Sequence, residues 1–171
     1  MHIDVEVDHE AWGPPDTAIR IIDAAVQATF DTVPGASRDR AVSIIMTGDD
    51  EAADFNQRHR GKAGATNVLS FPARRIPGLP LGEVPPLGDI VLAAGVIRRE
   101  AAEQGIEVEH HLAHLVVHGT LHLLGYDHET PEKAEEMQAL EASALKRLDI
   151  APGERNHGGA CGADDAAPRN R

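Results

Sequence analysis

Three histidines in the C-terminal half of the chain have the spacing of a metal site. His118 and His122 are four residues apart, and Gly125 and His128 follow within the next six. Residues four apart lie on one face of a helix, so these two imidazoles can point at one ion. A glycine just past a helix end can adopt the left-handed conformation that terminates the helix, and the chain can then return His128 to the same ion. The spacing H-x-x-x-H-x-x-G-x-x-H, shared with metzincin zinc sites, therefore predicts these three histidines as metal ligands.

Neighbouring histidines at the same spacing compete for this role, and helix length decides among them. Ligands at 114, 118 and 122 cannot all share an ion, because eight residues of helix span about 12 Å and Zn–N bonds are only about 2.0–2.1 Å long. We therefore expect His114 to support the site or to pack. His110 and His111 begin the predicted helix, and we expect both of them on the surface.

The number of ligands indicates what the metal does. Three protein ligands leave a fourth position for water, which is typical of a catalytic zinc, so we predict one Zn²⁺ ion. Imidazole also suits nickel, copper and iron, and zinc is inferred from geometry and general frequency. Metzincins place a glutamate after the first histidine as the general base, and here that position is Gly119. Its absence disfavours a peptidase and leaves water activation to the metal or to a group from elsewhere in the chain.

Charge is distributed unevenly along the chain. The formal net charge is −12, which argues against a general affinity for nucleic acid. The segment 56–82, however, contains no acidic residue, so it can bind an anion locally. Its five bases are Arg58, Arg60, Lys62, Arg74 and Arg75.

Two sequence blocks together resemble one known family. The block from His118 to His128, HGTLHLLGYDH, and the block from Asn56 to Pro72, NQRHRGKAGATNVLSFP, resemble the signatures of the YbeY family of bacterial metal-dependent endoribonucleases. A third block, LGDI at 87–90, agrees with them, and the resemblance covers roughly residues 3–148. One departure is Asn67, which stands where many members have aspartate.

The resemblance carries expectations about the site and its substrate. It implies a single zinc held by the three histidines, cleavage of single-stranded RNA, maturation of the 3′ end of 16S ribosomal RNA, and ribosome quality control, with ribosomal RNA and the small subunit as partners. It also implies that Arg60 lies near the metal and takes part in catalysis. A planar guanidinium can hold a phosphate through two hydrogen bonds and offset charge in the transition state. Lys62, Arg74 and Arg75 are candidate contacts to the RNA backbone.

Two other functions stay open on the residues alone. The ligand set also permits a zinc hydrolase of peptides or small molecules, although Gly119 argues against it. A non-catalytic ribosome-assembly factor with a structural metal is the second alternative. It predicts that metal removal unfolds the protein and that a histidine variant still supports ribosome assembly.

The elements that must position these residues alternate along the chain. Alternating apolar residues predict strands, and apolar residues at helical spacing predict helices. We expect one α+β domain over residues 1–150, with a mixed four-stranded sheet, about five helices and the metal site at the end of a central helix; the resemblance also implies a mixed four-stranded sheet. Residues 151–171 lack periodicity and are predicted to be a disordered tail. The expected strands are 2–7, 40–46, 66–71 and 89–93, and the expected helices are 14–30, 49–60, 95–104, 108–124 and 131–147.

The sequence also indicates a compartment. No apolar run approaches the roughly 20 residues that span a bilayer, and the first residues lack the layout of a secretory signal. The single cysteine, Cys161, cannot form an internal disulfide, which fits a reducing environment. We therefore expect a cytoplasmic protein without membrane partners.

Overall fold

The structure, a computed structural model, describes residues 1–74 and 82–151. This part of the chain contains four strands and six helices. In chain order they are β1 (His2–Val7), α1 (His9–Trp12), α2 (Asp16–Thr32), β2 (Ala41–Thr47), α3 (Asp49–Arg60), β3 (Val68–Pro72), β4 (Pro86–Ala93), α4 (Ala94–Gln104), α5 (Val108–Leu123) and α6 (Pro131–Arg147).

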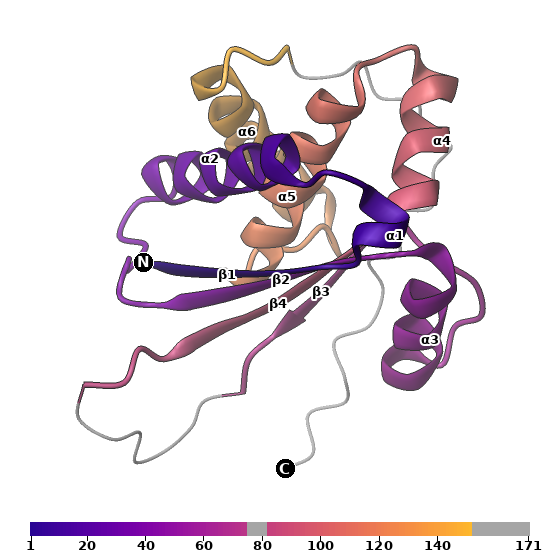
Figure 1. Cartoon of the computed structure of the whole chain (residues 1–171). Coiled ribbons are helices and arrows are strands. Elements are labelled where there is room, and N and C mark those ends of the chain that lie inside the picture. The colour runs from indigo at the N-terminus through magenta and orange to yellow at the C-terminus, as the bar shows by residue number, and fades with distance from the viewer. Residues whose placement is uncertain (75–81, 152–171) are drawn as a thin grey trace.

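The four strands form one mixed sheet in the order β1-β2-β4-β3. β1, β2 and β4 are parallel, whereas β3 runs antiparallel to β4 and forms one edge. Helices α2, α5 and α6 lie over one face of the sheet, and α3 lies at the end where β2 stops (Figure 1). The predicted α+β class with a mixed four-stranded sheet is therefore confirmed.

The core lies between this sheet and the layer of helices. In β2 every second residue is fully buried, as the alternation predicted: Val42, Ile44 and Met46 are 0% exposed. Helix α5 is the central element, because it contacts β3 and β4 of the sheet and also α2, α4 and α6. Among the described residues, no helix combines the length and the apolar character that crossing a membrane requires.

Several boundaries differ from the expectation. A short additional helix, α1, forms because the Asp8 carboxylate accepts hydrogen bonds from the backbone N–H groups of Glu10 and Ala11. β3 begins at Val68 rather than at 66, and β4 begins at Pro86 rather than at 89. The predicted tail lies outside the described residues except for Ala151.

Helix α3 is anchored to α4 by one aspartate. Asp49, the first residue of α3, accepts a hydrogen bond from the Val96 N–H at 3.0 Å and pairs with Arg99 at 2.9 Å. A carboxylate at a helix N-terminus satisfies backbone donors that have no partner within the helix. This contact holds the start of α3 against the start of α4.

A buried polar chain joins β3 to α4 and α5. The Asn67 side-chain amide donates to Glu100 Oε2 at 2.9 Å, and the same oxygen lies 2.7 Å from His111 Nε2. Asn67 also accepts from the Val68 N–H at 2.6 Å. His111 is only 4% exposed, so the expectation that it lies on the surface was wrong; His110 is exposed as expected. The burial of His111 depends on tertiary structure, because its partner Glu100 comes from another helix, α4.

Replacing Asn67 by aspartate tests this chain of contacts. In Asn67→Asp, a carboxylate faces the Glu100 carboxylate and the amide donor is lost. We expect the free energy of unfolding at pH 7 to fall by about 1–3 kcal/mol, measured by urea denaturation. The loss should shrink towards about pH 4, because protonation of either carboxyl restores a donor. Adding Glu100→Gln should recover most of the stability. An unchanged midpoint at pH 7 would contradict this account.

Candidate metal centre

The structure brings His118, His122 and His128 together. Each offers one ring nitrogen, and these nitrogens all lie within 4.8 Å of one another. The Nε2 atoms of His118 and His122 are 3.0 Å apart. The ring of His128 has its centroid 5.9 Å from that of His118 and 5.3 Å from that of His122. In the part of the chain that the structure describes, this is the one group of His, Cys, Asp or Glu side chains that could hold an ion.

These distances fit a tetrahedral ion. Two nitrogens that are each about 2.0–2.1 Å from one tetrahedral zinc lie roughly 3.3–3.4 Å apart. The contact between His118 and His122, at 3.0 Å, is close to that value, and the nitrogens of all three histidines lie within 4.8 Å of one another. All three side chains are partly buried. The donor set therefore suits an ion that prefers imidazole nitrogen.

A tight turn after α5 delivers the third histidine. The N–H of Gly125 donates to the His122 carbonyl, and the N–H of Tyr126 donates to the Leu121 carbonyl, both at 3.0 Å. These are the two hydrogen bonds of a Schellman motif, which requires a left-handed residue at its centre. Gly125 takes that conformation, with φ of 97°. The glycine thus reverses the chain and returns His128 to the helix it has just left.

Burial keeps His122 neutral. Removal from water, together with the nearby His118 and His128, lowers its pKa to about 4; burial is the largest cause, and the other two rings act because a second positive charge would be repelled. A neutral imidazole keeps the lone pair that a metal needs. The electrostatics of the site therefore leave His122 ready to bind a metal at neutral pH.

An acidic residue from α6 completes the surroundings of the histidines. One Glu141 oxygen lies 2.5 Å from His118 Nδ1, and the other lies 3.6 Å from His114 Nε2. Burial alone would raise the pKa of Glu141, but its interactions with His114 and His118 outweigh that effect and bring the pKa to about 2. His114 thus lies beside the site without joining the ligand group.

Arg60 lies against β3, the edge strand that α5 also contacts. It is the last residue of α3, which ends at Gly61 in the left-handed conformation. Its guanidinium donates to the Ser70 carbonyl at 3.5 Å and lies 5.9 Å from the centre of the Phe71 ring. On the same strand, the Ser70 hydroxyl lies 3.0 Å from where a Cβ of Gly119 would be. Arg60 and the metal-binding helix therefore meet at one residue of β3.

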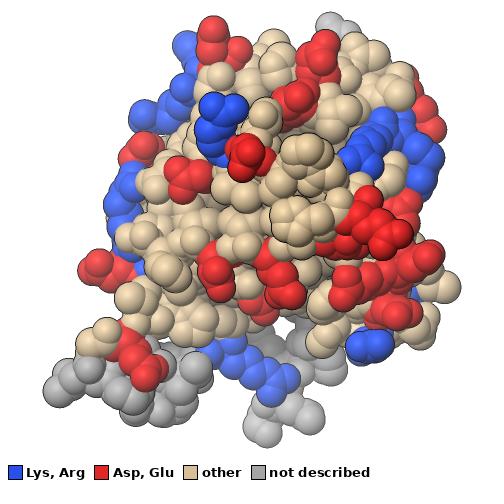
Figure 2. Space-filling view, in the orientation of Figure 1, with Lys and Arg blue, Asp and Glu red and all other residues tan. Residues whose placement is uncertain are grey.

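Two of the other residues predicted to contact RNA lie on the surface. Lys62 lies just after α3, Arg74 lies just after β3, and both are exposed; Arg75 lies outside the described residues. Helix α3 itself is polarised, with three acids in its first turn and Arg58, His59 and Arg60 in its last. Figure 2 shows acidic side chains gathered over the side where α3 lies, so acids adjoin the basic segment in space. Positive charge is thus concentrated at the end of α3 that carries Arg60.

Sequence reasoning did not identify Glu141 or Ser70. A signal for Glu141 was present, because α6 carries an apolar stripe whose Met137 and Ala144 are buried, and this glutamate falls on the same face. A charged residue on a buried helix face needs a partner. Ser70 had no such signal, since its role depends on where α5 crosses β3.

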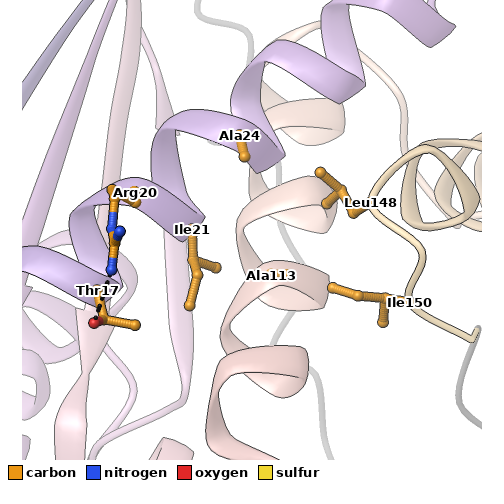
Figure 3. A pocket seen from close by; sticks show the side chains of 7 residues that line it. All are labelled: Thr17, Arg20, Ile21, Ala24, Ala113, Leu148 and Ile150. Carbon is orange, nitrogen blue, oxygen red and sulfur yellow. Dashed lines mark hydrogen bonds between the residues drawn. The ribbon is translucent and has the colours of Figure 1, made fainter.

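A separate hollow lies between α2 and the end of α6, over Ala113 of α5 (Figure 3). Its polar lining residues are Thr17 and Arg20, which are hydrogen-bonded to each other. The remaining side chains shown there are apolar, so this hollow offers no group for acid–base or metal chemistry. Its lining residues are Thr17, Arg20, Ile21, Ala24, Ala113, Leu148 and Ile150.

The charge state of His122 gives a test on the metal-free protein. Its imidazole should stay neutral down to about pH 4, whereas an unfolded histidine takes a proton near its ordinary pKa of 6.5. Proton binding therefore favours the unfolded state. Because of His122, the free energy of unfolding should fall as the pH falls from about 6.5 to about 4. Ring-proton NMR should show no titration of His122 near 6.5. In urea denaturation, His122→Gln should lose less stability than the parent between about pH 7 and pH 5.

Gly119 gives a second test, because the metzincin glutamate can be introduced there. A Cβ at 119 would lie 3.0 Å from Ser70 Oγ and 3.2 Å from Ile90 Cδ1, so the side chain would point into the sheet. Gly119→Glu should destabilise the protein by several kcal/mol through overpacking and a buried charge. It should create no peptidase activity on casein. Thermal unfolding and a casein assay check this, and a stable variant that digests casein would refute it.

Comparison with known proteins finds relatives over most of the chain. A protein of Maricaulis maris named Endoribonuclease YbeY is 43% identical over 151 residues, covering 87% of this chain and 89% of that protein. A Rhodopseudomonas palustris protein of the same name is 41% identical over 147 residues, covering 86% and 77%. The solution structure of a Thermotoga maritima protein matches with a TM-score of 0.54 and 22% identity over 92% of this chain and 98% of that one, which indicates a shared fold. The family model described as Endoribonuclease YbeY matches residues 6–149, and the chain therefore belongs to the YbeY family.

Proposed function

We propose that this protein is a zinc-dependent endoribonuclease that cleaves single-stranded RNA, matures the 3′ end of 16S ribosomal RNA and acts in ribosome quality control in the cytoplasm. Family membership supports the coarser activity, RNA cleavage. The single observation that carries the proposal is that Arg60 and α5, the helix that carries His118 and His122, both contact Ser70 of β3. A three-histidine group with an arginine held on the strand that its helix crosses suits a phosphodiester, which carries a negative charge at its reacting centre.

The histidines and Arg60 would have different roles at that phosphodiester. His118, His122 and His128 would hold the ion, which when bound supplies Lewis-acid polarisation of a phosphate oxygen and lowers the pKa of water. Arg60 would bind the scissile phosphate and offset the charge that develops on its oxygens. The Ser70 carbonyl and the Phe71 ring hold the guanidinium in place for that task.

Flanking phosphates would meet the other proposed RNA-binding residues, Lys62, Arg74 and Arg75. Lys62 and Arg74 are exposed before and after β3, where they can bind the RNA backbone on either side of the scissile phosphate. Arg75, outside the described residues, belongs to the same proposed group. Because the net charge of the protein is −12, non-specific attraction to RNA is weak, and binding depends on this local cluster.

The geometry at Gly119 favours RNA over peptides as the substrate. A peptidase of the metzincin type needs a carboxylate beside the metal to take a proton from water. Here that position faces the sheet, where a Cβ would come within 3.0–3.4 Å of side-chain atoms of Ser70 and Ile90. Glu141, the acid nearest to the ligands, is hydrogen-bonded to the ring of His118 on the side away from its metal-facing nitrogen.

Substitution of the site tests the proposal directly. Cleavage of a single-stranded RNA carrying the 16S 3′ end should fall by at least about 10²-fold in His122→Ala, because the ion is lost, and by about 10²–10³-fold in Arg60→Ala. The Arg58→Ala variant is the matched control, since Arg58 lies on α3 near Arg60 and is exposed. Parent-like cleavage by both site variants would exclude the proposal.

The same experiment separates the rival functions. Metal-dependent turnover of casein or a peptide library without RNA cleavage would favour the peptide or small-molecule hydrolase. Rescue of ribosome defects in cells by His122→Ala, with the fold lost on metal removal, would favour the assembly factor.

Two further measurements concern the reaction itself. Mapping of 16S 3′ ends in those cells tests the cellular role. The end groups of cleaved oligonucleotides identify the attacking group, because a 2′,3′-cyclic phosphate excludes direct attack by water.

A further inference from the structure

Glu141 occupies an unusual position for an acidic residue. It lies in α6 between the buried residues Met137 and Leu145, and its side chain is only 14% exposed. A carboxylate in such a place loses hydration, and that loss has to be offset by partners. Its partners are two histidines of α5, one for each oxygen: His118 at 2.5 Å and His114 at 3.6 Å.

The two histidines differ in what they can do for the carboxylate. The His118 side chain is 13% exposed and its contact is a hydrogen bond, whereas His114 is 37% exposed and lies at ion-pair distance. The hydrogen bond to His118 is therefore the directional contact. The interaction with His114 steadies the second oxygen and so fixes the plane of the carboxylate.

The atoms involved define which nitrogen of His118 is available to an ion. A carboxylate only accepts hydrogen bonds, so Nδ1 of His118 must carry the proton. In the neutral ring, Nε2 then keeps its lone pair, and this is the nitrogen that lies 3.0 Å from Nε2 of His122. One contact from α6 thus sets both the tautomer and the orientation of a ligand on α5.

We propose that Glu141 is a positioning residue that locks His118 in its metal-binding tautomer and orientation, and so determines how tightly the site holds its ion. This inference rests on the metal site of the proposed function and not on the identity of the RNA. Partners of this kind, which hydrogen-bond the second nitrogen of a ligating histidine, typically change metal affinity by 10–100-fold.

Metal affinity tests the proposal without any assay of cleavage. Zn²⁺ binding to the full-length chain is measured by competition with a chromogenic chelator. Glu141→Ala should weaken binding by about 10–100-fold, and the isosteric Glu141→Gln by a smaller factor, because an amide oxygen is a weaker acceptor. The control Glu136→Gln removes the same charge from an exposed position on α6 and should bind like the parent. Circular dichroism verifies that each variant is folded.

A spectroscopic readout separates positioning from simple packing. In the metal-free parent, ¹⁵N NMR of the imidazoles should show His118 protonated at Nδ1, and Glu141→Gln should show a mixture of tautomers. In a His118→Ala background, Glu141→Gln should cause no further loss of affinity.

The outcomes distinguish this inference from the proposed function. Glu141→Gln and Glu141→Ala that are folded, bind Zn²⁺ within twofold of the parent and keep His118 protonated at Nδ1 would overturn the inference and leave the metal site intact. A parent chain that binds no Zn²⁺ would overturn both. Zn²⁺ binding that weakens as expected, in a protein that cleaves no RNA, would support the inference and refute the proposed function.

Discussion

The site depends on how closely α5 lies against the sheet. At Gly119 a Cβ would come within 3.0–3.4 Å of Ser70 and Ile90, so the helix backbone rests almost directly on β3 and β4. His118 is the residue before this contact. The contact also brings the helix to β3, the edge strand whose Ser70 carbonyl accepts a hydrogen bond from Arg60.

The same closeness explains the chemistry that the site lacks. In a metzincin the position after the first ligand carries the catalytic carboxylate. In this fold that position belongs to the helix–sheet contact, and the acid near the ligands comes instead from α6. Glu141 contacts Nδ1 of His118, whereas Nε2 of that ring lies next to His122. The same spacing of histidines can therefore serve different reactions. The residue after the first histidine carries a catalytic carboxylate in metzincins, whereas here it packs against the sheet.

Local patterns were sufficient to predict that the three histidines come together and that a glycine turn joins them. The spacing of His118 and His122 and the left-handed Gly125 depend on contacts within a few residues, and Gly61 likewise ends α3 where expected. The burial of His111 and the role of Glu141 could not be predicted with the same ease, because both depend on residues from other helices. The strand order was also beyond local reasoning, since pairing between β2 and β4 joins distant segments.

This division has a consequence for how the site can be monitored. The three histidines and Glu141 lie within one continuous stretch, 118–141. Arg60 lies outside that stretch and contacts Ser70 on β3, an edge strand that pairs, among the described strands, with β4 alone, for example Val68 with Leu92. The histidine group and the position of the arginine therefore rest on different contacts, and a measurement of bound metal would not by itself report that the arginine is in place.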